Sequence, residues 1–209
     1  LEIGCDYAIN FASDSTNGPK IEKLIWMSQM IQSSNNILVW ANKNVKVKYL
    51  YASSGAVYKD KGKSETVKLD LKFNDLANTY ANTKLLCEEL CKANSEINGL
   101  DYVITRIFAV AGWHIPTTNH FAFGNFLNNL VNKKNIVLKS DGKSLRSFID
   151  QRDFASTIKK LLLNNVNEKI YNIGSDEMIS MAGVFFPTLS EDASIWAIVS
   201  AQPTIRSRA

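Results

Sequence analysis

The chain has few residues of the kinds that form disulfide frameworks or metal sites. Its 209 residues include three cysteines and two histidines. Cys87 and Cys91 lie four residues apart and Cys5 is remote from them, which is not the pattern of a disulfide framework. His114 and His120 stand at no ligand spacing, so the sequence predicts no metal site. Free thiols suit a reducing compartment, and we expect a cytoplasmic protein.

The sequence also lacks long apolar runs and blocks of one charge. No stretch approaches the length that spans a membrane. The net charge of +4 comes from scattered lysines, which argues against a nucleic-acid partner and is compatible with a small anionic substrate. An initiating methionine is also missing, so we expect the start to be cut rather than native.

Strand and helix patterns alternate through the first half of the chain. Short β-branched or apolar runs predict strands, and apolar residues at helical spacing predict helices. We expect strands at 6–13 (buried), 47–54 and 101–109. Helices are expected at 21–41, with Pro19 suited to the first turn of that helix, and at 80–90. Loops are expected at 14–18 and between the Ser54 strand and the Tyr80 helix. This alternation indicates βαβ units and a parallel sheet with helices on both faces.

The second half is less regular, and its last part differs in composition. We expect a loop at 112–119, a helix at 120–131, and short strands at 136–138 and 169–173. A turn is expected at 140–143, and residues 148–150 lead into a helix at 152–163. Residues 182–209 contain no lysine and no asparagine, although both are abundant before them. We interpret this tail as foreign to the domain; a native but divergent tail is the alternative.

Three residues form the candidate catalytic set. Tyr80 and Lys84 are four residues apart, so a helix places them on one face. The ammonium favours the phenolate, which makes Tyr80 a base that can act near neutral pH. Ser54 ends a predicted strand, where open α/β sheets place their ligands. An ordinary amphipathic helix would also explain Tyr80 and Lys84, but the strand end and later motifs favour catalysis.

With these motifs the chain resembles the extended short-chain dehydrogenase/reductases, specifically the NAD-dependent nucleotide-sugar epimerase/dehydratase family. The resemblance covers about residues 6–180. Its markers, in order, are Asn10–Ser13, Ser53–Tyr58, Tyr80-x3-Lys84, Arg106–Phe108, Phe123–Phe126, Gly142–Phe148 and Tyr171–Gly174.

The resemblance implies roles for individual residues. Tyr80 would be the acid/base, Lys84 would assist it and hold the nicotinamide ribose of NAD, and Ser54 would bond the reacting sugar oxygen. The remaining implied contacts are Phe11, Ala12, Ser13 and Phe108 with the cofactor, and Asn125, Phe126 and Arg146 with a nucleotide-diphosphate sugar. A guanidinium fits phosphate oxygens well; a solvated surface arginine is the alternative for Arg146.

The fold implied is a partial doubly wound parallel Rossmann-type sheet with part of a small substrate-binding region. The expected divisions are 1–110 (cofactor domain), 111–168 (substrate segment), 169–181 (last strand and turn) and 182–209 (tail). The glycine-rich turn of the family is absent, and the chain starts where the fourth strand should be. Met30 and Ala109 stand where many members carry asparagine. We expect this chain alone to be poorly soluble and not to bind NAD measurably.

The residues after Ser54 bear on the reaction. Dehydratases of the family typically carry an Asp-Glu pair there, whereas this chain has Gly55 and Ala56, which do no acid/base chemistry. We therefore expect a 4-epimerase acting through a 4-keto sugar. A 4,6-dehydratase, a ketoreductase, a binding protein without catalysis and an inactive fragment are the alternatives. The helix that carries Tyr80 is the candidate contact for a homodimer.

Overall fold

In a computed structural model the chain divides into two compact units. The structure describes residues 4–13, 20–58, 79–112, 114–115, 122–135, 137–138, 141–184 and 203–207. One unit comprises Leu1–Ile107, Lys159–Asn172 and Arg206–Ala209, and the other comprises Phe108–Ile158 and Ile173–Ile205. The described residues do not include the expected loop at 14–18, Pro19, residues 59–78 of the loop expected before Tyr80, or part of the loop at 112–119. None of the described helices is long and apolar enough to cross a membrane.

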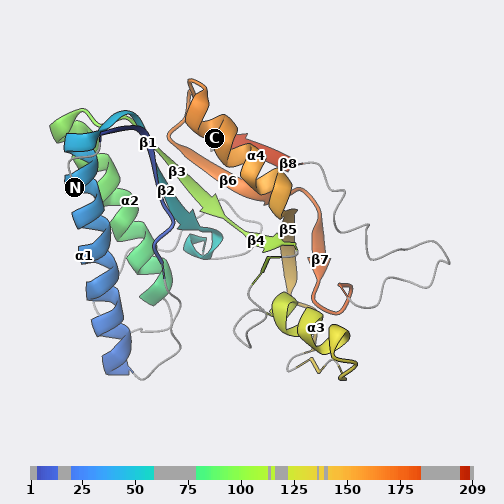
Figure 1. Ribbon diagram of the computed structural model, residues 1–209. Coiled ribbons are helices and arrows are strands. Elements are labelled where there is room, and N and C mark those ends of the chain that lie inside the picture. Colours follow the sequence, from blue (N-terminus) through green and yellow to red (C-terminus); the bar gives the residue numbers. More distant parts are fainter. Residues whose placement is uncertain are drawn as a thin grey trace. The chain divides into compact units, whose positions relative to one another are not determined.

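The larger of the two described sheets has five strands (Figure 1). Its order is β1 (Cys5–Asn10), β2 (Val45–Ser54), β3 (Tyr102–Ile107), β6 (Ile170–Ser175) and β8 (Pro203–Ser207). The β1–β2 and β2–β3 pairs are parallel. Parallel neighbours need long crossovers, and α1 (Lys20–Asn44) and α2 (Thr79–Asn98) supply them. The predicted Rossmann-like α/β fold is thus confirmed, whereas β8 was not expected.

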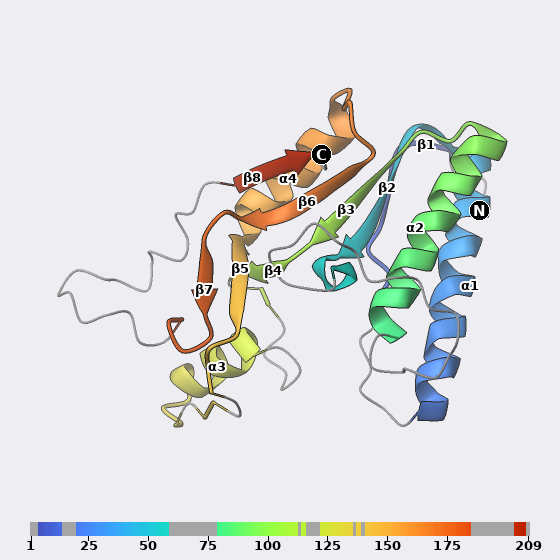
Figure 2. The same ribbon diagram turned by 180° about the vertical axis from the view of Figure 1, so that it is seen from behind.

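Alternate side chains of β2 face opposite sides of the sheet, as the pleat requires. Tyr49 and Tyr51 are fully buried in a core formed with residues of α1 and α2, which lie side by side on that face (Figures 1 and 2). Lys48 instead donates from Nζ to the carbonyl oxygens of Leu161, 3.3 Å away, and Asn164, 2.7 Å away, at the end of α4 (Gln151–Leu163). The sheet is therefore covered on both faces.

The first strand is less buried than the sequence predicts. Asn10 is its one buried residue, and Ile9 is 40% exposed. Among the described strands β1 has a single neighbour, β2, because it lies at one end of the sheet order. An edge strand leaves more of its surface uncovered than a central one, and this explains the difference.

The second unit contains a smaller sheet of β4 (Ala109–Ala111), β5 (Leu145–Asp150) and β7 (Met178–Ser180). β5 pairs in parallel with β4 and antiparallel with β7. The helix α3 (Ala122–Val131) supplies Phe126 to a core whose other buried members are Ala111, Phe148, Met181 and Val184.

Two details of the predicted strands are wrong. The strand expected at 101–109 ends at Ile107, and Ala109 begins β4 of the other sheet. Val137 and Leu138 form no strand, and Val137 is 64% exposed. Extended chain becomes a strand only when a neighbour completes its backbone hydrogen bonds, and the described sheets do not include this segment.

Candidate active site

Tyr80 and Lys84 lie together in the first turns of α2. Lys84 Nζ lies over the Tyr80 ring, 5.8 Å from its centroid. The predicted placement of the two residues on one helical face is therefore confirmed. Tyr80 is partly exposed, whereas Lys84 is 3% exposed, so the phenol is accessible and the ammonium approaches it from the protein interior.

The Lys84 ammonium is held by groups of β2. It donates to the Ala52 carbonyl oxygen at 2.9 Å and lies 5.2 Å from the centroid of the Tyr51 ring. Burial lowers the pKa of Lys84 to about 8, although negative charge at Cys87 and Glu88 acts in the opposite direction. The amine therefore titrates close to the pH at which enzymes work.

Apolar residues of α1 pack against Tyr80. The rings of Trp26 and Tyr80 stack with centroids 5.9 Å apart and an interplanar angle of 29°. Trp26 and Met30 are both buried and form a cluster against which Tyr80 packs. Met30 thus provides apolar support for the tyrosine.

Ser54 lies at the carboxyl end of β2 and caps the short 3-10 helix η1 (Gly55–Val57). Its Oγ accepts a hydrogen bond from the Ala56 backbone nitrogen at 3.2 Å. A hydroxyl that accepts in this way keeps its own proton for donation. The Lys84 partner Ala52 is two residues earlier in the same strand, and α2 packs against both β2 and η1. Ser54 and the backbone carbonyl that binds Lys84 therefore both lie at the carboxyl end of β2.

A buried ion pair joins α2 to β3 next to the carboxyl end of β2. Arg106 Nη2 lies 2.6 Å from Glu88 Oε2, and Arg106 Nε donates to Glu88 Oε1 at 3.0 Å. Ser53 also donates to Glu88 Oε1. Burial disfavours the cation, yet the hydrogen bonds and charge of Glu88 outweigh this effect and raise the pKa of Arg106.

The same hydrogen-bond network includes Tyr58, which directly follows η1. Arg106 Nη1 donates to the Tyr58 hydroxyl at 3.2 Å, and Tyr58 donates to Asn172 Oδ1 at 2.7 Å. Ser53 and Tyr58, which flank the turn, are thus both bonded within the network. Sequence reasoning missed Glu88, although its place four residues after Lys84 puts it on the same helical face.

The residues expected along the cofactor follow β1. Phe11, Ala12 and Ser13 are exposed, and the Ala12 backbone nitrogen donates to Asn10 Oδ1 at 2.9 Å. The Asn10 amide in turn donates to the buried Tyr49 hydroxyl at 3.0 Å. The Asn10 side chain therefore ties the turn after β1 to the core.

The other expected contact residues belong to the second unit. The Phe108 backbone nitrogen donates to the Ile173 carbonyl at 2.9 Å, and Asn125 Oδ1 accepts from Asn129 at 3.3 Å. Phe126 is 4% exposed and packs in the core of this unit. The role of each in binding stays a prediction, and for Phe126 the structure shows a packing role.

Arg146 lies on β5, also in the second unit, and is partly buried. Its Nη1 donates to Ser144 Oγ at 2.7 Å and to the Leu145 carbonyl at 3.0 Å. A guanidinium has five N–H donors, so these bonds orient it without using its full capacity. Within the described ranges, no group of three or more His, Cys, Asp or Glu side chains could hold a metal ion.

Comparison with known proteins identifies the family. Residues 1–174 match the NAD dependent epimerase/dehydratase family. The chain belongs to this family. It is 28% identical to GDP-mannose 3,5-epimerase of Arabidopsis thaliana over 192 residues, which are 85% of this chain and 50% of that protein. The chain thus spans half the length of this relative.

Solved structures of family members have the same fold. UDP-N-acetylglucosamine 4-epimerase from Methanobrevibacter ruminantium, in complex with UDP-N-acetylmuramic acid, matches with a TM-score of 0.71 at 25% identity, over 90% of this chain and 61% of that one. dTDP-glucose 4,6-dehydratase from Bacillus anthracis, in complex with NAD, matches with a TM-score of 0.65 at 19% identity, over 86% and 54% respectively. Epimerases and dehydratases are both similar to the chain.

Proposed function

We propose that this chain carries the catalytic residues of an NAD-dependent nucleotide-sugar 4-epimerase that acts through a 4-keto sugar. The observation that carries the proposal is the pair of Tyr80 and Lys84, in which a partly exposed phenol lies 5.8 Å from a buried ammonium. Such a pair suits a base that takes a proton from a sugar hydroxyl and later returns it. The proposed location is the cytoplasm.

Each residue of the site has a proposed task. Tyr80 accepts the proton of the sugar hydroxyl at C4, and the Lys84 ammonium stabilises the negative charge on Tyr80. Ser54 donates a hydrogen bond to the same sugar oxygen, since its Oγ accepts from Ala56 and keeps its proton free for donation. The Trp26 ring holds the Tyr80 ring in place.

The residues present suit the nicotinamide end of NAD. Lys84 gives one hydrogen bond to Ala52, and an ammonium has three N–H donors, so it can also bond a ribose hydroxyl. Phe11–Ser13, at the carboxyl end of a parallel strand, and Phe108 would be the further contacts. When bound, NAD supplies reversible uptake of hydride at the sugar carbon.

The substrate proposed is a nucleotide-diphosphate sugar. Arg146 would bind its phosphates, with Asn125 as a further contact, while Phe126 would shape the site from the core in which it packs. The named 4-epimerase with 25% identity over 90% of this chain supports the substrate class. A homodimer through α2 is the proposed assembly.

A 4,6-dehydratase is the second candidate, because one of the similar structures has this activity. Expulsion of water needs an acid and a base beside the sugar. The residues after Ser54 are Gly55 and Ala56, which lie in η1 and have no ionisable side chain. This difference favours the epimerase.

The test uses the full-length protein that carries these residues, with NAD and a panel of UDP- and dTDP-hexoses. We expect interconversion of C4 epimers, followed by NMR, with no 4-keto-6-deoxy sugar. Deuterium placed at C4 should stay in the product, because the hydride returns to the same carbon. Loss of water with accumulation of a 4-keto-6-deoxy product would overturn the epimerase proposal in favour of the dehydratase. The absence of any reaction with every sugar nucleotide of the panel would contradict both proposals.

A further inference from the structure

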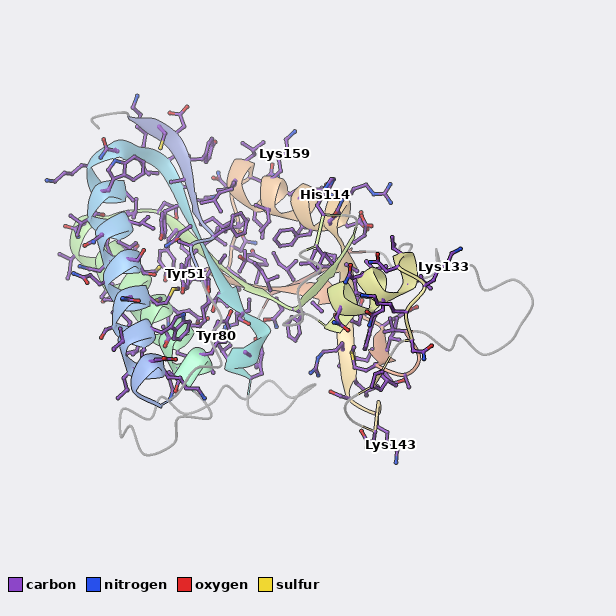
Figure 3. All side chains as sticks on the ribbon, turned by 60° about the horizontal axis from the view of Figure 1, so that its bottom comes forward. Tyr51, Tyr80, His114, Lys133, Lys143 and Lys159 are labelled. Atoms are coloured by element: carbon purple, nitrogen blue, oxygen red, sulfur yellow. The ribbon has the colours of Figure 1, made fainter. Side chains whose placement is uncertain are left out.

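The Lys84 ammonium has aromatic rings near it from two elements. Its Nζ is 5.8 Å from the ring centroid of Tyr80 on α2 and 5.2 Å from that of Tyr51 on β2. Figure 3 labels both tyrosines, beside the helices that cover this face of the sheet. Cations within about 6 Å of a ring face are attracted by the π electrons. Of the two rings, that of Tyr51 is the nearer to the ammonium.

Tyr51 is fixed in place by its surroundings. It has no exposed surface and belongs to the core between the sheet and the helices α1 and α2. It directly precedes Ala52, whose carbonyl accepts the Lys84 hydrogen bond. One short stretch of β2 therefore provides both the carbonyl and the ring that contact the ammonium.

The Tyr51 ring acts on Lys84 as a neutral group. Burial raises the pKa of Tyr51, and negative charge at Cys87 raises it further. The raised pKa favours the neutral phenol over the phenolate, so the ring faces Lys84 without a charge of its own. What the ring offers to the cation is its π face.

We propose that Tyr51 is a positioning residue, whose ring supports the Lys84 ammonium through a cation–π contact and, with the Ala52 carbonyl, holds it against Tyr80. The functional meaning rests on the proposed function, while the contact itself does not. The opposing explanation is that Tyr51 is only an apolar wall that excludes water from Lys84.

Substitutions at position 51 separate these explanations. Tyr51→Phe keeps the π face and removes the hydroxyl, whereas Tyr51→Leu keeps an apolar side chain and removes the π face. A series of Phe variants with increasing fluorination keeps the shape while weakening the π face, and it serves if the Leu variant does not fold. Tyr49→Leu is the matched control, because Tyr49 is equally buried in the same core.

The measurement is the titration of Lys84, followed by NMR in the full-length protein that carries these residues, with 13C at the lysine ε carbons. Lys84→Arg assigns the signal. The cation–π contact stabilises the charged amine, so its loss lowers the pKa. We expect Tyr51→Phe and Tyr49→Leu to leave the Lys84 midpoint near that of the parent, and Tyr51→Leu to lower it by about 0.5 to 1 pH unit. The midpoint should also fall with each added fluorine.

A Lys84 midpoint in Tyr51→Leu equal to or above that of Tyr51→Phe would overturn the proposal, as would a fluorinated series without a trend. A fall of the same size in Tyr51→Phe would overturn it too, because the hydroxyl would then be responsible. The titration needs no substrate, so its failure leaves the epimerase proposal standing. Failure of the sugar assay, in turn, leaves the contact between Tyr51 and Lys84 unaffected.

Discussion

The guanidinium of Arg106 and the carboxylate of Glu88 form a two-point contact in the protein interior, with Nη2 to Oε2 at 2.6 Å and Nε to Oε1 at 3.0 Å. Both side chains are almost fully buried, with exposures of 2% and 1%. Each charge lacks water and depends on the other. The pair links the helix of Tyr80 to β3, and through Ser53 it links both to the strand of Ser54.

We expect Glu88→Gln to destabilise the chain by about 3 to 5 kcal/mol, because it leaves the buried Arg106 cation without its counterion. Glu89→Gln is the matched control on the same helix. Glu89 is 55% exposed and pairs with Lys92, and surface pairs of this kind contribute about 0 to 1 kcal/mol. Urea unfolding measures both changes, and equal losses in the two variants would contradict the prediction.

The lowered pKa of Lys84 predicts how the free energy of unfolding changes with pH. Burial lowers its pKa from 10.5 to about 8, so between these values the unfolded chain binds the proton that the folded chain has released. The contribution of Lys84 to the free energy of unfolding therefore rises with pH. It is fully present above pH 10.5 and is lost as the pH falls through about 8.

The comparison of the parent with Lys84→Met isolates this effect. Burial raises the pKa of Cys91 and Tyr51, which lowers stability at high pH in both proteins and cancels in the difference. We expect the unfolding free energy of the parent, relative to Lys84→Met, to increase by about 1 to 3 kcal/mol between pH 7 and pH 10. The surface variant Lys92→Met is the control. A constant difference would show that Lys84 is not desolvated.

Replacement of the proton carrier tests the catalytic role of Tyr80. In the full-length protein, Tyr80→Phe should lower turnover by a factor on the order of 100 or more and leave NAD affinity nearly unchanged, because only the hydroxyl is removed. Lys84→Met should damage both turnover and NAD affinity, since that ammonium serves both. Near-normal turnover of Tyr80→Phe on every active sugar nucleotide would refute the mechanism.

Substitution of Arg146 tests the proposed phosphate contact. Hydrogen bonds to charged groups contribute about 1.5 to 3 kcal/mol, so Arg146→Gln should weaken binding of UDP or dTDP by roughly 10- to 100-fold in calorimetry with the full-length protein. Lys143→Gln, an exposed residue just before β5, is the control for loss of one positive charge. Equal weakening by the two variants would indicate a general charge effect and not a specific contact.

The sequence by itself determined the regular part of the fold. Alternating strand and helix patterns predicted β1, α1, β2, α2 and β3 in order. Such predictions succeed because the spacing of apolar residues is a property of residues that are close along the chain. The spacing of Tyr80 and Lys84 placed them on one helical face for the same reason. The turn expected at 140–143 is also local: in its described part, the Lys143 backbone nitrogen donates to Asp141 Oδ1.

Only the tertiary structure decided what surrounds these residues. The pairing of Glu88 with Arg106, the Tyr51 ring beside Lys84 and the Trp26 ring on Tyr80 each join two different elements of secondary structure. The partial exposure of β1 and the absence of a strand at Val137 likewise depend on which neighbour lies beside each segment. Burial, and with it the lowered pKa of Lys84, is a property of the packed sheet and helices. Local sequence patterns cannot encode it, because desolvation is set by atoms that only folding brings near.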